Sequence, residues 1–335
     1  MKQLTIALLF GGQSHEHHVS CQSAVGVYHA LRVAGHNVLP IGISPTGDWY
    51  LWRGSMTAIP PKWYTLPTCQ AITLAPHGKL STGEDTYSPQ VAFPVLHGPF
   101  CEDGRLQGLL DLWGIPYVGC GVEASVLSMN KVLTKRVAEG IGIPTLPYVA
   151  LTPHTPKEGI LEHLAFPLFV KPARAGSSVG CGMALDPQAL ETALATAFSV
   201  DDTVLVEPFT KGQEVEVAVF EDEDLVVSRV GEILSTSPFY DYETKYGANS
   251  AKTRIPANIP HHLAEQARTY AATLFRALGC RHLSRVDFFV TKEGLYLNEI
   301  NTLPGFTPIS MYPSLMEDAG IPLPDLVSRL CRAAL

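Results

Sequence analysis

The residues of this chain that could do chemistry are concentrated in one stretch, 283–305, which reads LSRVDFFVTKEGLYLNEINTLPG. Two strand-like runs flank Lys292-Glu293-Gly294, which we interpret as a three-residue hairpin loop with glycine where φ is positive. Alternate residues of a strand share one face of a sheet. The loop length predicts four cross-strand pairs: Thr291 with Leu295, Phe289 with Leu297, Asp287 with Glu299, and Arg285 with Asn301.

Four polar side chains of this hairpin would project from the same face. Directly opposed residues have Cβ atoms about 4.5–5.5 Å apart, so Asp287 and Glu299 would repel each other or hold a proton between them. A divalent cation removes that conflict, and with Asn301 the ligand set is all oxygen, which suits Mg²⁺ and not zinc. The alternative is that Arg285 neutralises one carboxylate in a surface network, and this stretch alone leaves both open.

Two further stretches could bind a nucleotide. In FVKPARAGSSVG (169–180) a strand ends at Lys171 and a loop of small residues follows, so backbone N–H groups and an ammonium could approach polyphosphate. A plain hairpin turn is the alternative, since the chain has no GxxxxGK[ST] loop. In VLVEPFTKGQEVEV (204–217) an acidic hinge could offer backbone groups to adenine, with Phe209 either stacking on the base or packing in the core.

The stretch GGQSHEHHVSC (11–21) has the composition of a metal site, and it also follows an apolar run as the turn of a nucleotide fold would. On a helix beginning near Ser14, however, only His17 and Cys21 share a face. We therefore interpret Ser14 as the N-cap. Glu16 would lie in the first turn, where the helix dipole favours an ionised carboxylate.

Hydrophobic periodicity predicts the elements that position these stretches. We divide the chain into an α/β lobe with a mainly parallel sheet (1–127), a central lobe (128–213) and a C-terminal lobe (214–335). The pattern predicts strands at 3–10, 37–43, 91–98, 166–172, 182–186, 203–209, 283–290 and 295–300, and helices at 14–34, 123–139 (capped by Gly140) and 261–278.

Residues 235–260 have no strand or helix period, and a connection this long is unusual in a compact lobe unless it works as a lid. The segment contains aromatic and charged side chains, among them Tyr240, Tyr242, Lys245 and Tyr246. A disordered surface excursion is the alternative.

Composition excludes several classes of protein. The 335 residues are 46% hydrophobic and 17% charged, with a net charge of −8 and no dense Lys/Arg stripe, which argues against a nucleic-acid partner. The apolar runs are far shorter than ~20 residues, which argues against a membrane partner, and we interpret the first of them as a strand rather than a signal peptide. Seven scattered cysteines without a CxxC indicate a reducing, cytoplasmic location.

Together, hairpin carboxylates, a phosphate loop with a lysine and an acidic hinge occur in an order that resembles the ATP-grasp ligases. Within that superfamily the chain resembles the D-alanine–D-alanine ligases from end to end. The resemblance implies a three-lobed α/β ATP-grasp fold with an N-terminal parallel-sheet domain. It also implies ATP-dependent joining of two D-alanines through a D-alanyl phosphate, for peptidoglycan precursors. The stretches that carry it are FGGQSHEHHVS, LHGPFCEDG, KPARAGSSVG, FYDYETKY and NEINTLPGFTPISMYP.

The resemblance implies roles for individual residues. Glu16 would pair with the ammonium of the first D-alanine, in a hydrogen-bonded set with Ser177 and Tyr246. Arg285 and the backbone N–H of Gly305 would form the oxyanion site for the tetrahedral intermediate. The remaining contacts would be His97, Ser310 and Met311 at the second substrate; Lys131, Lys171, Ser178, Glu207, Phe209, Glu214 and Lys245 at ATP; and Asp287, Glu299 and Asn301 at Mg²⁺.

The resemblance further implies two Mg²⁺ ions, with Mn²⁺ as a substitute, and a homodimer formed through the N-terminal lobe; a dependence on K⁺ stays open. Because the chain keeps Tyr246 and Ser310-Met311, we expect a dipeptide rather than a depsipeptide product. The alternatives are another ATP-grasp enzyme joining a different acid and amine, a nucleotide-binding regulator without catalysis, and a dehydrogenase. The missing GxGxxG after the first strand argues against the last of these.

Overall fold

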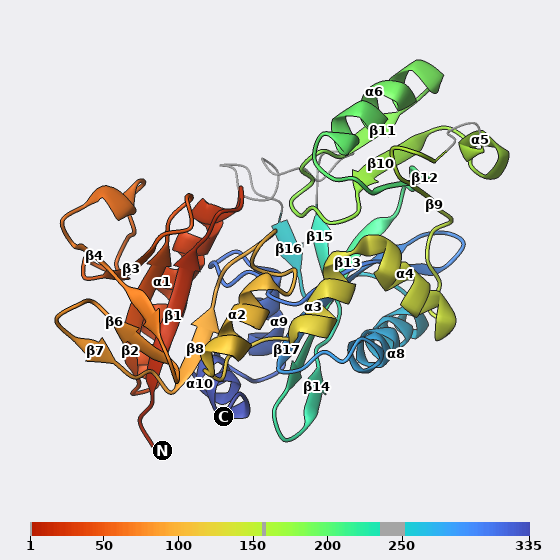
Figure 1. Cartoon of the computed structure of the whole chain (residues 1–335). Coiled ribbons are helices and arrows are strands. Elements are labelled where there is room, and N and C mark those ends of the chain that lie inside the picture. The colour runs from red at the N-terminus through yellow and green to blue at the C-terminus, as the bar shows by residue number, and fades with distance from the viewer. Residues whose placement is uncertain (1, 156–158, 235–251) are drawn as a thin grey trace.

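The computed structural model describes residues 2–155, 159–234 and 252–335. Their strands form sheets of five, four and six strands and a small three-stranded sheet. Figure 1 shows the N-terminal five-stranded sheet at one end of the molecule and the four-stranded sheet at the other, with the six-stranded sheet between them.

The N-terminal sheet is built around β1, whose TIALLFG sequence is buried over almost its whole length. A continuous apolar run is what a central parallel strand requires, because helices or loops cover both of its faces. Parallel pairing joins β1 to β2 and β8, whereas β3 and β4 add antiparallel strands at one edge. The strand bounds in this part are β1 (Thr5–Gly11), β2 (Asn37–Ile43), β3 (Trp49–Trp52), β4 (Cys69–Ala71), β8 (Val91–Pro94), and, in the small sheet, β5 (Thr73–Ala75), β6 (Lys79–Ser81) and β7 (Thr86–Tyr87), with a 3₁₀ turn at η1 (Trp63–Thr65).

The first helix begins later than the sequence predicts. Helix α1 (His17–Val33) has Glu16 at its N-cap, and no side chain caps it, so the predicted cap at Ser14 is wrong. Ser14 Oγ instead donates to the His97 carbonyl at 2.5 Å and accepts from the Glu16 N–H at 3.2 Å. Glu16 is therefore held in a turn before the helix and not within its first turn.

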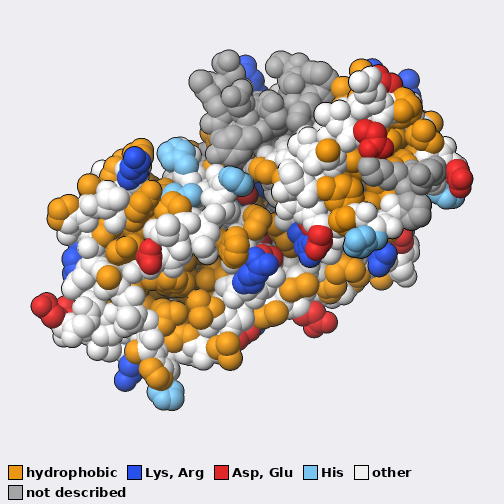
Figure 2. All heavy atoms as spheres, turned by 45° about the horizontal axis from the view of Figure 1, so that its top comes forward, with side chains coloured by type: hydrophobic (Ala, Val, Ile, Leu, Met, Phe, Trp, Pro, Cys, Tyr) orange, Lys and Arg blue, Asp and Glu red, His pale blue; other side chains and the backbone are white. Residues whose placement is uncertain are grey.

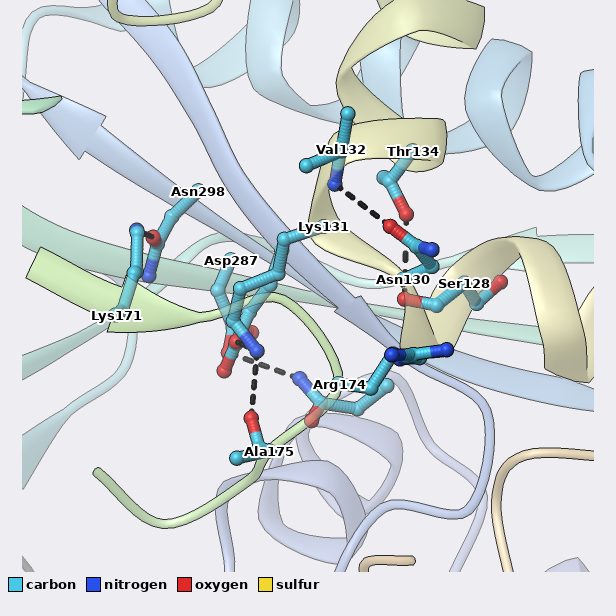
Figure 3. A network of polar contacts seen from close by, with 12 residues as sticks. Ser128, Asn130, Lys131, Val132, Thr134, Lys171, Arg174, Ala175, Asp287 and Asn298 are labelled. Atoms are coloured by element: carbon cyan, nitrogen blue, oxygen red, sulfur yellow. Dashed lines mark hydrogen bonds and ion pairs between the residues drawn. The ribbon is translucent and has the colours of Figure 1, made fainter. Parts of the chain in front are cut away.

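The predicted helix 123–139 is two helices, α3 (Val122–Met129) and α4 (Lys131–Gly140), separated at Asn130. The Asn130 side chain accepts from the Val132 and Leu133 N–H groups and so starts a new helix (Figure 3). Gly140 ends α4 as a helical residue and Ile141 is the C-cap, so the predicted cap is displaced by one residue. The other helices are α2 (Arg105–Trp113), α5 (Ile160–His163), α6 (Pro187–Phe198), α8 (His261–Ala277), α9 (Met311–Asp318) and α10 (Leu323–Ala333).

The four-stranded and six-stranded sheets contain the predicted strands, shortened by one or two residues at several ends. In the four-stranded sheet the order is β11-β10-β12-β9, and in the six-stranded sheet β16-β15-β13-β17-β18, with β14 paired to β13. Their bounds are β9 (Val149–Leu151), β10 (Leu168–Pro172), β11 (Gly182–Ala184), β12 (Val204–Pro208), β13 (Gln213–Glu221), β14 (Leu225–Val227), β15 (Gly231–Leu234), β16 (Lys252–Arg254), β17 (Leu283–Val290) and β18 (Leu295–Asn301).

The β17–β18 hairpin follows the predicted register at its base but not at its tip. Asp287 pairs with Glu299 and Arg285 with Asn301, as predicted, while Val290 pairs with Leu295 and Phe288 with Leu297. The turn therefore spans four residues instead of three, and one extra residue on β18 between Leu297 and Glu299 corrects the register. That residue is Asn298, which forms a β-bulge.

The predicted lid, 235–260, lies largely outside the described residues. Its last part is described, and it includes strand β16, which pairs with β15. The expectation that the whole segment lacks a strand is therefore wrong for residues 252–254.

The two ends of the chain pack together. One hydrophobic cluster contains Phe10 and Leu31 of the N-terminal sheet region together with Leu326 and Leu330 of α10. On the face shown in Figure 2, the described Lys and Arg side chains are scattered among acidic and apolar ones. No helix within the described ranges is long and apolar enough to cross a membrane.

Candidate active site

Two cavities adjoin each other where the three large sheets approach. We call the first the acidic cavity; Glu16, Glu102, Arg285, Asp287 and Glu299 are among its walls, and its volume is about 150 Å³. The second, the hinge cavity, lies beside the β12–β13 connection and has a volume of about 740 Å³. That volume lies in the range of sites for ligands of nucleotide size. Residues 175–177, Lys131 and Glu299 line both cavities, so the two form one continuous site.

Every predicted site residue that the structure describes lines one or both of these cavities. They come from α4, α9, the four-stranded and six-stranded sheets, and the loops around them, so they are far apart in the sequence. Lys245 and Tyr246 lie outside the described residues, and their roles stay predictions.

The hairpin carboxylate Asp287 is held by an arginine. Arg285 donates to it through two nitrogens, at 2.8 and 2.7 Å, and also lies 3.0 Å from Glu216 on β13. Burial by itself would lower the pKa of Arg285, but the charges of Asp287 and Glu216 raise it well above its usual value. Asn301 donates to Asp287 at 3.0 Å. Arg285 therefore does pair with one hairpin carboxylate, but in the wall of a cavity and not in the surface network of the predicted alternative.

This donor set nevertheless fits Mg²⁺. Asp287 and Glu299 are directly opposed across the hairpin with Asn301 on the same face, and all three offer oxygen. The described residues contain no group of three or more His, Cys, Asp or Glu side chains arranged for a metal. Two carboxylates and an amide are too few for a closed cage, and Mg²⁺ usually completes its octahedron with water and phosphate oxygens.

The bulge turns Asn298 toward the cavities, where its amide oxygen accepts from Lys171 Nζ at 3.3 Å. Figure 3 shows Lys131, Lys171, Asp287 and Asn298 together at this point. Lys131, the first residue of α4, donates to the Ala175 carbonyl at 2.7 Å and lies 3.4 Å from Glu299. The sequence analysis missed Asn298, because its predicted register left no room for a bulge.

Lys171 shares Glu207 with a second lysine. Glu207 is almost completely buried, and its two oxygens lie 2.5 Å from Lys171 Nζ and 2.5 Å from Lys135 Nζ. Burial would raise the pKa of Glu207, but the two ammonium groups outweigh it and hold that pKa below its usual value. The sequence analysis missed Lys135, although its spacing of four residues from Lys131 places both lysines on one face of α4.

Glu16 connects two loops of the site through a hydrogen bond from Ser177. Ser177 Oγ donates to Glu16 Oε1 at 2.5 Å, so the predicted hydrogen bond between them is present in the structure. Ser177 and Ser178 both have positive φ, 48° and 59°, which is uncommon for residues with a side chain. Gly98 must be glycine here, because a Cβ would lie 2.9 Å from Glu16 Oε2.

Glu102 is a further, half-buried carboxyl group in the acidic cavity, and the sequence analysis did not assign it a role. It accepts from the Gly98 N–H at 2.7 Å and from the Leu303 N–H at 3.2 Å. Burial raises the pKa of Glu102 to about 8, and the charge of Glu16 acts in the same direction. His97 bonds to the Leu303 carbonyl at 3.1 Å, and burial lowers the pKa of that imidazole.

Three of the predicted oxyanion and second-substrate residues, Gly305, Ser310 and Met311, lie in the turn before α9 or at the start of that helix. A Cβ at Gly305 would lie 2.8 Å from Ser310 Oγ, so glycine permits this close approach. Ser310 Oγ accepts from the Thr307 N–H at 3.0 Å and lies 2.8 Å from the Thr307 hydroxyl. Met311 begins α9 with its side chain against Gly231.

The hinge places aromatic side chains at the larger cavity. Phe209 and Phe169 both line it, with ring centroids 6.5 Å apart. The Phe209 N–H donates to the Pro167 carbonyl at 2.8 Å, so this backbone donor is engaged within the protein.

The metal interpretation of residues 11–21 has no support in the described structure. His17 bonds to the Gly12 carbonyl at 2.7 Å and accepts from Trp63 Nε1 at 3.1 Å, so both ring nitrogens are engaged. This arrangement fixes the neutral tautomer with the proton on Nδ1. Cys21 is buried in the core beneath the helix.

The whole chain is similar in structure and in sequence to known ligases. The chain matches the structure of the D-alanine-D-alanine ligase from Coxiella burnetii with a TM-score of 0.90 and 35% identity, over 100% of this chain and 94% of that one. It matches the VanG D-Ala:D-Ser ligase from Enterococcus faecalis with a TM-score of 0.89 and 34% identity, over 100% of both chains. The D-alanine--D-alanine ligase of Acetivibrio thermocellus is 42% identical, over 98% of this chain and 95% of that protein.

The fold that the whole chain shares with these ligases defines the protein as an ATP-grasp enzyme. The family model described as D-ala D-ala ligase N-terminus matches residues 5–120, and the model described as D-ala D-ala ligase C-terminus matches residues 137–332. The chain belongs to the D-alanine–D-alanine ligase family, which confirms the resemblance noted in its sequence.

Proposed function

We propose that this protein joins two D-alanine molecules in an ATP-dependent ligation and so makes D-alanyl-D-alanine for peptidoglycan precursors. The observation that carries the proposal is the Glu16–Ser177 hydrogen bond, which fixes a carboxylate in the same cavity as the hairpin carboxylates. Membership of the ligase family supports it. ATP would phosphorylate the first D-alanine, and the second amine would displace phosphate from the acyl phosphate.

Glu16 would bind the ammonium of the first D-alanine. The carboxylate is 8% exposed and accepts from Ser177, which fixes the position of one oxygen and leaves the other directed at Gly98 and Gly176. An ammonium bound there would hold the carboxylate of the same substrate toward the hairpin, where the phosphoryl group arrives.

Arg285 and the N–H of Gly305 would stabilise the negative oxygen of the tetrahedral intermediate. Both line the acidic cavity, and Arg285 is held in place by two carboxylates before any substrate binds. A donor that does not reorganise during the reaction is the most effective kind. His97, Ser310 and Met311, in the wall of the same cavity, would bind the second amino acid.

The hinge cavity would hold ATP. Its lysines would bind the phosphates, while the aromatic and acidic residues of the hinge would bind the adenosine end. When bound, Mg²⁺, as two ions or with Mn²⁺ in its place, would reduce the repulsion between the phosphates and the attacking carboxylate. The residues assigned to these contacts are Lys131, Lys171, Ser178, Glu207, Phe209 and Glu214 for ATP, and Asp287, Glu299 and Asn301 for the metal.

The proposal also covers the setting of the enzyme. We expect a cytoplasmic homodimer formed through the N-terminal lobe, and a division into lobes at residues 1–127, 128–213 and 214–335. The two family models support the first of these boundaries, because one ends at residue 120 and the other begins at residue 137.

The test of the proposal is an assay with ATP, Mg²⁺ and D-alanine in which phosphate and dipeptide are both measured. We expect equal amounts of phosphate and D-alanyl-D-alanine. Because one structural relative is a D-Ala:D-Ser ligase, parallel reactions add D-serine or D-lactate as the second substrate. Product with either of these but none with D-alanine alone would contradict the assignment.

The role of the hairpin is tested by Asp287→Asn. We expect loss of nearly all turnover in a protein that still folds, because the amide keeps the shape of the side chain and Arg285 keeps Glu216 as a partner, while the charge that would hold the metal is removed. The matched control is Glu293→Gln, an exposed carboxylate at the tip of the same hairpin, which should keep wild-type turnover. Wild-type turnover in Asp287→Asn would reject the metal assignment.

A further inference from the structure

Lys135 is a lysine inside the protein with no role in the function proposed so far. Only 1% of it is exposed, and it lines neither cavity. Its ammonium lies 2.5 Å from Glu207 Oε1, donates to the Leu146 carbonyl at 3.2 Å and lies 5.2 Å from the centre of the Tyr148 ring. A lysine is rarely fully buried unless it is paired, so its partner explains its presence.

The partner, Glu207, connects Lys135 to the hinge cavity. Its second oxygen holds Lys171, which does line that cavity and also donates to Asn298. The buried row Lys135–Glu207–Lys171 therefore holds two positive charges around one negative charge. Lys135, the inner lysine, is enclosed by the protein, and Lys171, the outer lysine, lines the cavity where an anion would bind.

Removing the inner lysine would change what the outer lysine can do. A buried carboxylate without a partner on one oxygen costs several kcal/mol, so it draws strongly on the partner that remains. Glu207 would then be neutralised by Lys171 alone, and Lys171 would have less charge and fewer donors for a phosphate. Desolvation already lowers the pKa of Lys135, so the protein bears a cost to keep this group at the site.

We propose that Lys135 is a positioning residue for nucleotide phosphate: it holds one oxygen of Glu207 from the protein side, so that Lys171, which pairs with the other oxygen, keeps a donor for an anion in the hinge cavity. This inference rests on the proposed function, because it assumes that the hinge cavity binds ATP. It assigns Lys135 no contact with the substrate, and its effect passes through Glu207.

The test compares the binding of Mg·ADP and of adenosine by calorimetry, without D-alanine. Adenosine has the same base and sugar but no phosphate, so the ratio of the two affinities isolates the phosphate contribution. We expect Lys135→Met to lower the affinity for Mg·ADP relative to that for adenosine by roughly tenfold, while the affinity for adenosine itself changes little. In turnover, the KM for ATP should rise more than kcat falls.

A second substitution separates this role from a merely structural one. In Lys135→Met/Glu207→Gln no carboxylate competes for Lys171, so the ratio should return toward the wild-type value. Glu207→Gln alone should raise the ratio above wild type. The double variant lacks the unpaired buried carboxylate that would destabilise Lys135→Met, so the inference can be judged by comparing it with Glu207→Gln even if Lys135→Met alone does not fold.

The outcomes are distinct. An unchanged ratio in Lys135→Met, or a reduced ratio that the double variant does not restore, would overturn the role of Lys135 and leave the ligase proposal intact. A wild-type protein that binds no Mg·ADP and forms no dipeptide would overturn the proposed function, and this inference with it.

Discussion

At the scale of single residues, the site is a set of buried charges, each held by a named partner. Ser177 binds Glu16, Arg285 binds Asp287, and Lys131 lies beside Glu299. A buried ion is costly unless its partner and hydrogen bonds are well placed. Glu102 differs, because among the described residues its hydrogen bonds come from backbone N–H groups alone, and its raised pKa of about 8 reflects desolvation that they do not fully offset.

Glu102 should therefore make stability depend on pH. Because its folded-state pKa is raised from 4.5 to about 8, its contribution is fully present below pH 4.5 and is lost as the pH rises to about 8. We expect Glu102→Gln, which cannot ionise, to gain stability relative to wild type over that interval, by up to a few kcal/mol. Chemical denaturation at several pH values measures the difference.

The matched control for this experiment is Glu123→Gln, an exposed carboxylate in the first turn of α3. Its stability should follow wild type across the same pH range. A constant difference between Glu102→Gln and wild type from pH 5 to pH 8 would show that Glu102 is ionised throughout.

At the scale of elements, two asparagines position residues of the proposed phosphate site. Asn130 ends α3 and caps α4, so that Lys131 begins a helix directed at the hairpin. Asn298 forms the bulge in β18, which restores the register that opposes Asp287 to Glu299. In both cases a local irregularity, and not the regular element, brings a side chain to the cavity.

The cap can be tested by Asn130→Ala. We expect a loss of about 1 kcal/mol in the free energy of unfolding, because the Val132 and Leu133 N–H groups lose their acceptor. We also expect a higher KM for ATP, because Lys131 follows the cap directly. Asn130→Asp keeps an acceptor and should stay near wild type in stability; equal losses in both variants would reject the capping role.

At the scale of the whole molecule, the N-terminal and C-terminal regions are joined by buried histidines. His36 accepts from the Leu4 N–H at 3.2 Å and bonds to Ser328 of α10 at 2.9 Å. His282 accepts from the Gly119 N–H at 3.1 Å, across a sequence separation of 163 residues. Each must be neutral to accept, so protonation would weaken the junction.

Acid should therefore destabilise this junction through His282. Burial lowers the pKa of His282 from 6.5 to about 4, with Arg281 acting in the same direction. Its contribution to stability is present above pH 6.5 and is lost as the pH falls through about 4, a change of about 3 kcal/mol. We expect His282→Asn, which can accept the same bond and tolerates the positive φ of 64°, to depend less on pH over that interval.

The measurement is the free energy of unfolding at pH 4, 5, 6 and 7, with His154→Asn as a control on an exposed histidine. Parallel curves for His282→Asn and wild type would contradict the prediction. A steeper wild-type curve, matched by His154→Asn, would support it.

The sequence predicted most of the chemistry of this protein. Strand alternation and the motif residues were enough to oppose Asp287 to Glu299 and to name Glu16, Lys171 and the hinge, and the comparisons confirm the family. Such features are local or carried by motifs, so they can be identified without knowing the fold. The hairpin also shows a limit, because the predicted strand register was right at the base of the hairpin and wrong by one residue at its tip.

The sequence by itself determined the family, the order of the elements and the residue types of the site. Only the tertiary structure decided which charges face each other: Lys135 beside Glu207, Arg285 between Glu216 and Asp287, and Glu102 on the backbone of residue 303. Strand alternation places Arg285 and Asp287 on one face, but the contacts to Lys135, Glu216 and residue 303 join segments that no periodicity connects. The reason is physical: burial determines the pKa of a charged group and its contribution to stability, and burial is a property of the packed molecule rather than of any one segment.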